Sequence, residues 1–494
     1  MLKGERVIEI KPVTRLEGHA KIDIFLDDRG NVEDAYFQIV ELRGFEEFCK
    51  GRPVEEMPRL TTRLCGVCPW AHHIASSKAV DDVFDVEPPP AGKKLRELGY
   101  CAHFLESHLE HIYALGFAPD FLVGPKSAAK KRNIFGVIEK VGAKIGKEVI
   151  KNRAYAVKIE EMLGGKSTHP VYGVPGGVSH SLKEEDRKDI LSMGEALVEF
   201  CLFTLKVVDD YVLKNREYLD LILDKDMYYH ETYYIGLVDE RNRVNFYEGE
   251  HRVVDPGGRE FTRFKAKDYL KHIREHVEPW TYLKFPYLKN VGWKGIVEGP
   301  DSGIVRAAPL ARLNVADGMA TPRAQEAYEK FFDALGGKPV HYTLTFHWAR
   351  AVEALYAAER IVELAKDPEI TDVKVREIPT GIKGEGVAAI AAPRGSLIHH
   401  YVADKNGLIE KVNLIVATAF NYGGMCLSIK KAAKALIKEF NVDEGILNMV
   451  EMAFRAYDPC FSCATHFLPG QMPMEIDIIT CGGKLYKRLQ RGTP

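Results

Sequence analysis

The stretch Arg63-Leu64-Cys65-Gly66-Val67-Cys68-Pro69-Trp70-Ala71-His72 contains a Cys-x-x-Cys pair that is closely followed by a histidine. A second unit of the same kind, Asp458-Pro459-Cys460-Phe461-Ser462-Cys463-Ala464-Thr465-His466, lies near the other end of the chain. A single Cys-x-x-Cys is ambiguous between a redox dithiol, half of a zinc site and a cluster ligand. Two such pairs at opposite ends of one chain predict a four-thiolate metal site that brings both ends of the fold together.

The composition is that of an ordinary globular protein. The 494 residues are 46% hydrophobic and 28% charged, and the formal net charge is −2. Without a surplus of Lys and Arg there is no reason to expect a nucleic acid partner. No stretch approaches the roughly 18 apolar residues of a membrane span. The first residues, Met1 to Arg6, show no apolar signal core. We therefore expect a cytoplasmic protein without a membrane span.

The cysteines outside the two pairs are scattered singly. In a reducing compartment nine cysteines do not indicate a disulfide scaffold. Single cysteines are usually small buried hydrophobic residues, and we expect this of Cys49, Cys101, Cys201, Cys426 and Cys481. No third group of cysteines therefore remains to bind an iron–sulfur cluster within this chain.

The pattern along the chain predicts one large α+β body, rich in helices, rather than separate domains. The expected parts are a β segment with a hairpin turn at Asp27–Gly30 (1–57), a helical body with a β excursion near 247–261 (58–386), a second small β region (387–416), C-terminal helices with the second Cys motif (417–466) and a tail (467–494). Helical periodicity covers roughly 71–84, 91–116, 135–163, 183–224, 324–366, 427–440 and 443–456. Gly336-Gly337 is expected to break the fifth of these helices.

The segment from Lys126 to Arg153 is strongly basic and has two interpretations. It could be a docking surface for an acidic partner, or a solvated amphipathic helix. Its basic residues alternate with apolar residues at helical spacing, which favours the helix.

Three kinds of metal or redox site fit paired Cys-x-x-Cys motifs. In each pair the two thiolates can reach one ion, and we expect Gly66 to relieve the backbone where the loop folds over it. Tetrahedral thiolate sites suit zinc or iron–sulfur clusters. A structural zinc site normally has its ligand pairs about 15–20 residues apart, unlike these. Redox dithiols would need thioredoxin-like βαβ surroundings, which neither pair has.

Five motifs together resemble the large, catalytic subunit of nickel–iron hydrogenases. They are Arg15-Leu16-Glu17-Gly18-His19, Arg43-Gly44-Phe45-Glu46, the first Cys motif with His72, Ala392-Pro393-Arg394-Gly395, and Asp458-Pro459-Cys460 with Cys463 and His466. They occur in the family's order and span nearly the whole chain. In detail the chain is most similar to the cytoplasmic archaeal type that does not reduce deazaflavin (the viologen-reducing type) of methanogens and their relatives. The resemblance implies the helix-rich fold of such large subunits and reversible cleavage of H₂ into protons and electrons.

The resemblance also implies the metal ligands and the proton route. All four cysteines would bind nickel, Cys65 and Cys460 terminally, with Cys68 and Cys463 bridging to an iron that carries carbon monoxide and cyanide. Cys460 would be the first base, and Glu17 would relay the proton outward.

Other residues are assigned to the surroundings of the metals by the same resemblance. Arg394, which follows Pro393 in the turn motif, would project over the open site and polarise H₂ or bind cyanide. Thr418 would donate to a second cyanide, and His72 would contact the Cys68 sulfur. Asp120 is expected as a carboxylate near Arg394.

A magnesium site is the third implied group. Its ligands would be Glu46, His466 and the carbonyl of Leu414; the alternative for Glu46 is a salt bridge with Arg43. The remaining histidines of one helix are expected to serve packing and an interface rather than metal binding: His103, His108 and His111.

Two features depart from, or extend, the family pattern. Ala391 stands where the family often has Glu, which puts in doubt any proton route through that position. The tail 467–494 follows His466, where the family's maturation protease cuts once nickel is in place; a permanent strand at Met474–Ile479 is the alternative.

The implied partners are an iron–sulfur small subunit, a further electron-transfer subunit, and nickel-insertion and protease factors. An iron–sulfur partner is also expected because this chain has no cluster motif of its own and no nucleotide-binding Gly-x-Gly-x-x-Gly. Two alternatives remain: a large subunit of a deazaflavin- or NAD(P)-linked hydrogenase, and a metal-free structural relative of the kind found in respiratory complex I.

Overall fold

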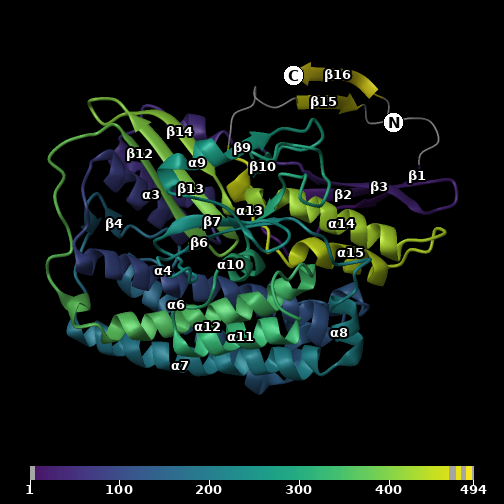
Figure 1. Cartoon of the computed structure of the whole chain (residues 1–494), viewed down its shortest axis with the longest axis horizontal. Coiled ribbons are helices and arrows are strands. Elements are labelled where there is room, and N and C mark those ends of the chain that lie inside the picture. Colours follow the sequence, from purple (N-terminus) through teal and green to yellow (C-terminus); the bar gives the residue numbers. More distant parts are fainter. Residues whose placement is uncertain (1–5, 467–473, 480–484, 492–494) are drawn as a thin grey trace.

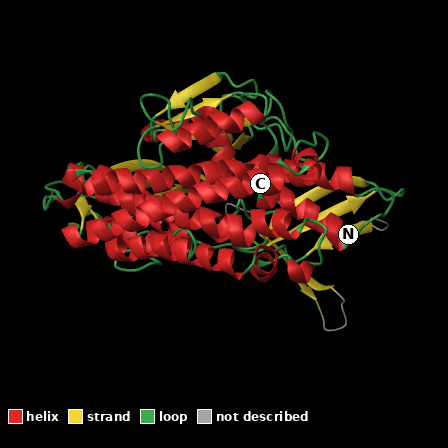
Figure 2. Cartoon of the chain, turned by 90° about the horizontal axis from the view of Figure 1, so that it is seen from below, coloured by secondary structure: helices red, strands yellow, loops and turns green. Residues whose placement is uncertain are grey.

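Long helices packed side by side form the main layer of the molecule (Figure 2). The structure, a computed structural model, describes residues 6–466, 474–479 and 485–491. These helices include α4 (Pro90–Glu110), α6 (Ala143–Gly164), α7 (Glu184–Val208) and α12 (Phe346–Lys366). α12 packs against α7 and α4, and α6 packs against α4 and α7. Every residue of α12 from Phe346 to Ala358 is buried, as expected of a helix with neighbours on all sides.

A three-stranded antiparallel sheet forms the second β region at the predicted place. Its order is β12 (Glu385–Ala392), β13 (Gly395–Ala403) and β14 (Ile409–Ile415). Helix α3 (Pro69–Val83) packs against β12 and β13. The first Cys motif leads directly into α3, so this packing places the motif beside the β12–β13 turn.

The N-terminal segment is a sheet of β1 (Arg6–Ile10), β2 (Ala20–Leu26) and β3 (Val32–Ile39). The predicted turn is confirmed: the Gly30 N–H donates to the Asp27 carbonyl at 3.0 Å, and Gly30 has a φ of +79°. Helix α14 (Tyr422–Leu436) covers β3.

The β excursion near 247–261 is larger than the sequence pattern predicts. The hairpin of β7 (Glu250–Val254) and β8 (Glu260–Phe264) joins β6 (Tyr233–Val238) and β11 (Val305–Arg306) in a four-stranded sheet. All six residues of β6 are buried, so β6 lacks the alternation that reveals a half-exposed strand. Short two-stranded sheets pair β4 (Gly173–Val174) with β5 (Gly177–Val178) and β9 (Ile273–His276) with β10 (Phe285–Leu288).

The segments predicted as helices are helical, but some of the predicted ranges cover two helices that the backbone separates. Gly142, at φ +87°, ends α5 (Ile134–Val141) and precedes α6. The Asn215 side chain caps α8 (Arg216–Ile222), which a π-turn (Asp209–Leu213) separates from α7. Gly336 and Gly337 both have positive φ and follow α11 (Pro322–Ala334), which confirms the predicted break before α12.

The remaining short helices connect these parts. They are α1 (Phe45–Phe48), η1 (Val54–Glu56), α2 (Met57–Leu60), η2 (Thr61–Leu64), η3 (His111–Leu115), η4 (Ala118–Val123), η5 (Ala129–Lys131), η7 (Ala266–Asp268), α9 (Tyr269–His272), α10 (Pro309–Val315), η8 (Thr343–Thr345), η9 (Pro368–Thr371), α13 (Ala417–Phe420), α15 (Glu444–Arg455) and α16 (Phe461–Ala464).

The tail after His466 contains a hairpin of β15 (Met474–Ile479) and β16 (Leu485–Arg491), which form a two-stranded sheet of their own among the described strands (Figure 1). The strand at Met474–Ile479 therefore forms where the sequence pattern indicates it. The connecting residues 467–473, through which a cut after His466 would pass, lie outside the described residues. Within the described ranges no helix is long and apolar enough to cross a membrane.

Candidate metal centre

The first Cys pair is shaped by its own loop. η2 ends at Leu64 and α3 begins at Pro69, so the pair occupies the short turn between two helices. The Cys65 sulfur accepts from the N–H groups of Val67 (3.1 Å) and Cys68 (3.2 Å). A Cβ added at Gly66 would meet no heavy atom of the protein within 4 Å, so the expected role of Gly66, relief of the backbone over the metal, stays a prediction.

The second Cys pair is held by distant parts of the chain. The Phe461 N–H donates to the Glu17 carbonyl (3.0 Å), and the Glu17 N–H donates to the Pro459 carbonyl (3.4 Å). The Cys460 N–H donates to the Thr418 hydroxyl at 3.1 Å. These contacts pair the second Cys motif with the N-terminal segment, in a parallel bridge between Glu17 and Cys460.

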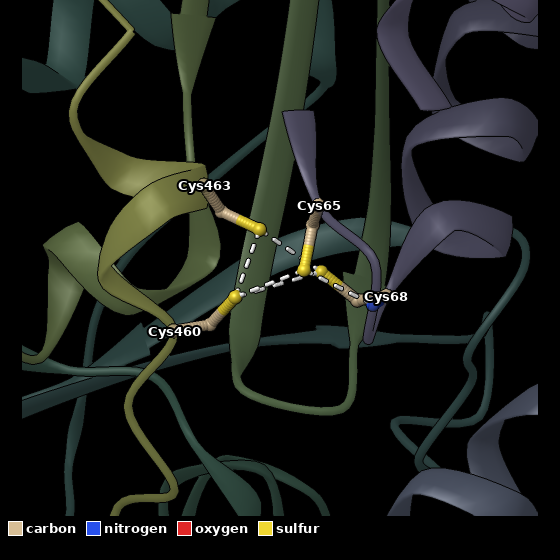
Figure 3. A group of neighbouring side chains, drawn as sticks. All are labelled: Cys65, Cys68, Cys460 and Cys463. Atoms are coloured by element: carbon tan, nitrogen blue, oxygen red, sulfur yellow. Dashed lines mark hydrogen bonds between the residues drawn. The ribbon is translucent and has the colours of Figure 1, made fainter. Parts of the chain in front are cut away.

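Four cysteine sulfurs meet at one buried point (Figure 3). The Cys65–Cys460 distance is 3.2 Å, Cys68–Cys463 is 3.1 Å, Cys460–Cys463 is 2.9 Å and Cys68–Cys460 is 4.0 Å. The sequence prediction that the two pairs form one site is therefore confirmed. Thiolate sets of this kind suit soft transition metals.

The protein alone cannot keep four thiolates in so small a space. Burial opposes ionisation, but the neighbouring sulfurs stabilise one thiolate and hold the pKa of Cys65 well below its usual range. Burial and the adjacent sulfurs raise the pKa of Cys460 and Cys463 well above that range. Four thiolates at once need a cation among them, so this donor set fits a metal centre better than a set of free thiols.

Glu17 lies against the cluster. The Cys460 sulfur donates to Glu17 Oε2 at 3.1 Å, and the Ser462 N–H donates to the same oxygen at 3.1 Å. Burial, and then the negative charge at Cys65, raise the pKa of the Glu17 carboxyl. The predicted carboxylate is thus within hydrogen-bond distance of the predicted base.

Arg394 projects from the β12–β13 turn and is 3% exposed. Its guanidinium donates to Ser107 Oγ (3.2 Å) and pairs with Asp458 (2.9 Å). The carboxylate beside Arg394 is therefore Asp458 rather than the expected Asp120. Asp120 pairs with Arg15 (2.6 Å) and Arg455 (3.2 Å) instead.

A small pocket adjoins the sulfurs. It is lined by apolar side chains with Arg394 and Thr418 among them: Cys68, Ala71, His72, Ala392, Pro393, Arg394, Leu397, Val416, Ala417, Thr418, Cys460 and Cys463. The Arg394 Nε is buried and makes no hydrogen bond to a described residue. A cationic donor in an apolar pocket beside soft ligands fits an iron that carries small anionic ligands.

His72 is paired through one ring nitrogen with a second histidine. Its Nδ1 lies 3.2 Å from the Nε2 of His399, whose Nδ1 is 2.6 Å from the Tyr401 hydroxyl. Burial lowers the pKa of His72 to about 4, so the ring is neutral. His72 lines the same pocket as Cys68, and its expected contact with the Cys68 sulfur stays a prediction.

The predicted magnesium ligands come together behind the second pair. Glu46 Oε1 accepts from the Leu414 N–H (2.8 Å) and lies 3.3 Å from His466 Nδ1. The Leu414 N–H contacts Glu46, and the expected role of the Leu414 carbonyl as a magnesium ligand stays a prediction. Arg43 donates to the carbonyls of Leu64 (2.7 Å) and Ser462 (3.2 Å), which disfavours the Arg43–Glu46 salt bridge as the role of Glu46.

Other sequence expectations can be placed on the structure. Cys49, Cys101, Cys201 and Cys426 are buried, as predicted, and Cys481 lies outside the described residues. The helical histidines form buried polar pairs: His103 with Glu160, His108 with Glu353 and His111 with Asp458.

Sequence reasoning missed Asp458, Ser107, Ser462 and His399. Of these four, only Asp458 and Ser462 could have been suspected from the sequence, because both lie inside the second Cys motif.

Comparisons with known proteins agree with this geometry. A family model described as nickel-dependent hydrogenase matches residues 43–132 and 222–466, and a HoxL-like model matches residues 7–42. The chain is 50% identical to an F420-non-reducing hydrogenase iron-sulfur subunit of Archaeoglobus profundus, over 98% of this chain and 99% of that protein. It is 42% identical to an F420-non-reducing hydrogenase subunit of Methanothermobacter marburgensis, over 98% of this chain and 99% of that protein.

Solved structures give the same result. The crystal structure of an NAD⁺-reducing [NiFe]-hydrogenase in the H₂-reduced state superposes with a TM-score of 0.87 at 35% identity, covering 93% of this chain and 99% of that chain. A chain with this fold, these four cysteines and these relatives belongs to the nickel-dependent hydrogenase family.

Proposed function

We propose that this protein is the large, catalytic subunit of a nickel–iron hydrogenase that cleaves H₂ reversibly into protons and electrons. The observation that carries the proposal is the contact of Glu17 with Cys460 inside a buried set of four cysteines. That contact joins a soft metal-ligand set to a carboxylate that can accept a proton. The alternative of a metal-free structural relative is not favoured, since all four ligands are present and meet.

Cys65, Cys68, Cys460 and Cys463 would hold the nickel, with Cys68 and Cys463 also reaching the iron. When bound, this metal pair supplies the electrophile that polarises H₂ and accepts its electrons. Arg394 and Thr418 line the pocket where the iron and its carbon monoxide and cyanide ligands would lie. Glu46, His466 and Leu414 would surround the magnesium ion.

The protein's own part in the reaction is to move the proton. Heterolytic cleavage requires a base beside the metal, and the Cys460 sulfur is the ligand that contacts Glu17. Glu17 Oε2, held by the Ser462 N–H, accepts the proton and passes it outward. Arg394, fixed by Asp458, keeps a positive charge beside the reacting H₂.

Electrons need a conduit outside this chain. We infer two partners, one small subunit with iron–sulfur clusters and one further electron-transfer subunit, since the single buried cysteines of the described residues lie apart from one another. The relatives that are named F420-non-reducing support an acceptor other than deazaflavin, and we place the complex in the cytoplasm. Removal of the tail after His466 by a maturation protease, following nickel insertion, completes the proposal.

Infrared spectroscopy of the purified complex, combined with elemental analysis, tests this function. We expect metal-bound carbonyl and cyanide bands, about one nickel and about one iron per chain, and H₂-dependent dye reduction. Zinc in place of nickel and iron, or the absence of these bands from active protein, would refute it.

A further inference from the structure

A dense group of positive charges lies on helices α5 and α6, outside the metal centre. Residues 126–153 contain nine Lys or Arg residues and two Glu, although the whole chain has a formal net charge of −2. The family model that matches 43–132 and 222–466 leaves both helices unmatched. The family model therefore gives no account of this surface.

Four lysines form a stripe along α6. With 3.6 residues per turn, Lys144, Lys147, Lys151 and Lys158 project within roughly 60° of one another. All four are exposed. The carboxylates near this stripe, Glu148 and Glu161, lie 3.9 Å from Lys151 and 3.8 Å from Lys158. Among the described residues no ion pair is formed by Lys144 or Lys147, so the stripe keeps an excess of positive charge.

An apolar groove runs beside the lysine stripe. Its lining is mostly apolar and includes Leu109, Tyr113, Ile134, Ile150 and Val157. The charged residues that also line it are Glu110, Arg153, Lys158 and Glu161. Ile150 is 58% exposed. The neighbouring Phe135 of α5 is 78% exposed, a large apolar side chain in an exposed position.

The groove and the stripe together describe one kind of ligand. A concave apolar site beside a row of cations fits a segment with an apolar face and acidic flanks, as in helix-in-groove recognition. A membrane surface is flat and binds convex amphipathic faces, so the concave site disfavours anionic lipid. Nucleic acid would leave the apolar groove unfilled.

We propose that the α5–α6 surface docks an acidic amphipathic segment of another subunit of the complex. Acidic side chains of that segment would contact Lys144, Lys147 and Lys151, and its apolar side chains would cover Ile150 and Phe135. Charge pairs at the rim of such an interface steer association, while the buried apolar contacts hold it. The inference rests on the partner subunits proposed above, but not on the metal chemistry.

Zero-length carbodiimide cross-linking of the purified complex, read by mass spectrometry, tests the occupant. The reagent joins a lysine amine to a carboxylate in direct contact. We expect cross-links from Lys144, Lys147 or Lys151 to Asp or Glu residues of a different subunit. Cross-links from these lysines only within this chain, or to a second copy of it, would overturn the proposal.

Two variants separate the charges from the groove. Lys144→Glu/Lys147→Glu/Lys151→Glu should raise the dissociation constant of the complex at least tenfold, and Phe135→Ser/Ile150→Ser should weaken it without changing its salt dependence. The matched control Lys289→Glu/Lys405→Glu/Lys411→Glu reverses three exposed lysines elsewhere and should leave the complex intact.

The outcomes of these variants are decisive in either direction. Nickel content and H₂/D₂ exchange should be unchanged in all three variants, which separates lost docking from a lost metal centre. Equal weakening by the control, unchanged affinity in both test variants, or binding of the unmodified complex to phosphatidylserine vesicles that the stripe variant abolishes would refute a protein partner at this surface.

Discussion

The two Cys pairs have the same spacing but are built in opposite ways. The first pair takes its shape from its own loop, where Cys65 accepts two N–H groups from residues that follow it within the same turn. The second pair is held by Glu17 and Thr418, both far away in sequence. Half of the metal centre is therefore local structure, and the other half is a product of tertiary closure.

Replacing a cysteine ligand should have the largest effect on activity and nickel content. The effect should be the same for either Cys pair. We expect Cys65→Ser and Cys460→Ser each to abolish H₂/D₂ exchange and nickel content, because each removes a ligand from a set of four that the metal needs. Atomic absorption and exchange mass spectrometry measure both. Cys426→Ser, at a buried cysteine outside the cluster, is the control and should retain nickel. Full activity in either ligand variant would contradict the shared site.

Glu17→Gln should separate proton transfer from metal binding. General acid–base groups contribute roughly 10²–10⁴-fold to a rate, so exchange should fall by about that factor while nickel and iron stay bound. The amide keeps an oxygen that can accept from the Ser462 N–H, so the fold around the second pair should persist. Glu41→Gln, which alters a carboxylate near the Ser462 hydroxyl, should lose far less activity. Unimpaired exchange in Glu17→Gln would remove its relay role.

Arg43→Ala should weaken the connection between the pairs. This one side chain donates to carbonyls beside both motifs, Leu64 and Ser462, and also to Arg63. Loss of these charged hydrogen bonds should cost about 2–3 kcal/mol in the free energy of unfolding. Hydrogen exchange should become faster at 458–466 than at 61–68, because the N–H groups of Cys460 and Phe461 depend on bonds to Thr418 and Glu17, far away in sequence. Equal protection of both segments would mean that the asymmetry between the pairs is unimportant.

Thr418→Val should give the smallest effect. It removes the acceptor of the Cys460 N–H while keeping the side-chain volume, and an unpaired buried N–H costs about 1–3 kcal/mol. We expect a modest fall in thermal stability and a small shift of one cyanide band in the infrared spectrum. Thr62→Val, near the first pair but bonded to the Arg59 carbonyl, should leave the bands unmoved.

Much of the candidate site and part of the fold could be predicted from the sequence, because short motifs indicate them. The spacing of the cysteines indicated one shared site, and the turn residues Asp27–Gly30 gave the N-terminal hairpin. The fully buried strand β6 escaped prediction because it shows no alternation. Gly142 divided a continuous helical pattern through a backbone angle that periodicity does not report.

The errors at the site share one cause. Asp120 was expected near Arg394, but Asp458 holds that place, and Asp120 joins Arg15 and Arg455. The pairing of His72 with His399 was likewise not foreseen. Which of several buried ionisable groups pair with one another depends on tertiary packing, and a single sequence gives the candidates without the partners.

The parallel bridge between Glu17 and Cys460 has one more consequence. The strip of backbone that brings Cys460 to the other three sulfurs also brings Glu17, the proposed proton acceptor, to the Cys460 sulfur. A molecule in which these two segments have not paired would then lack both the ligands of the second Cys pair and the Glu17 acceptor. We expect such a molecule to be inactive rather than partly active. In this chain, pairing of the Glu17 segment with the Cys460 segment would complete the ligand set and place the proton acceptor in one step.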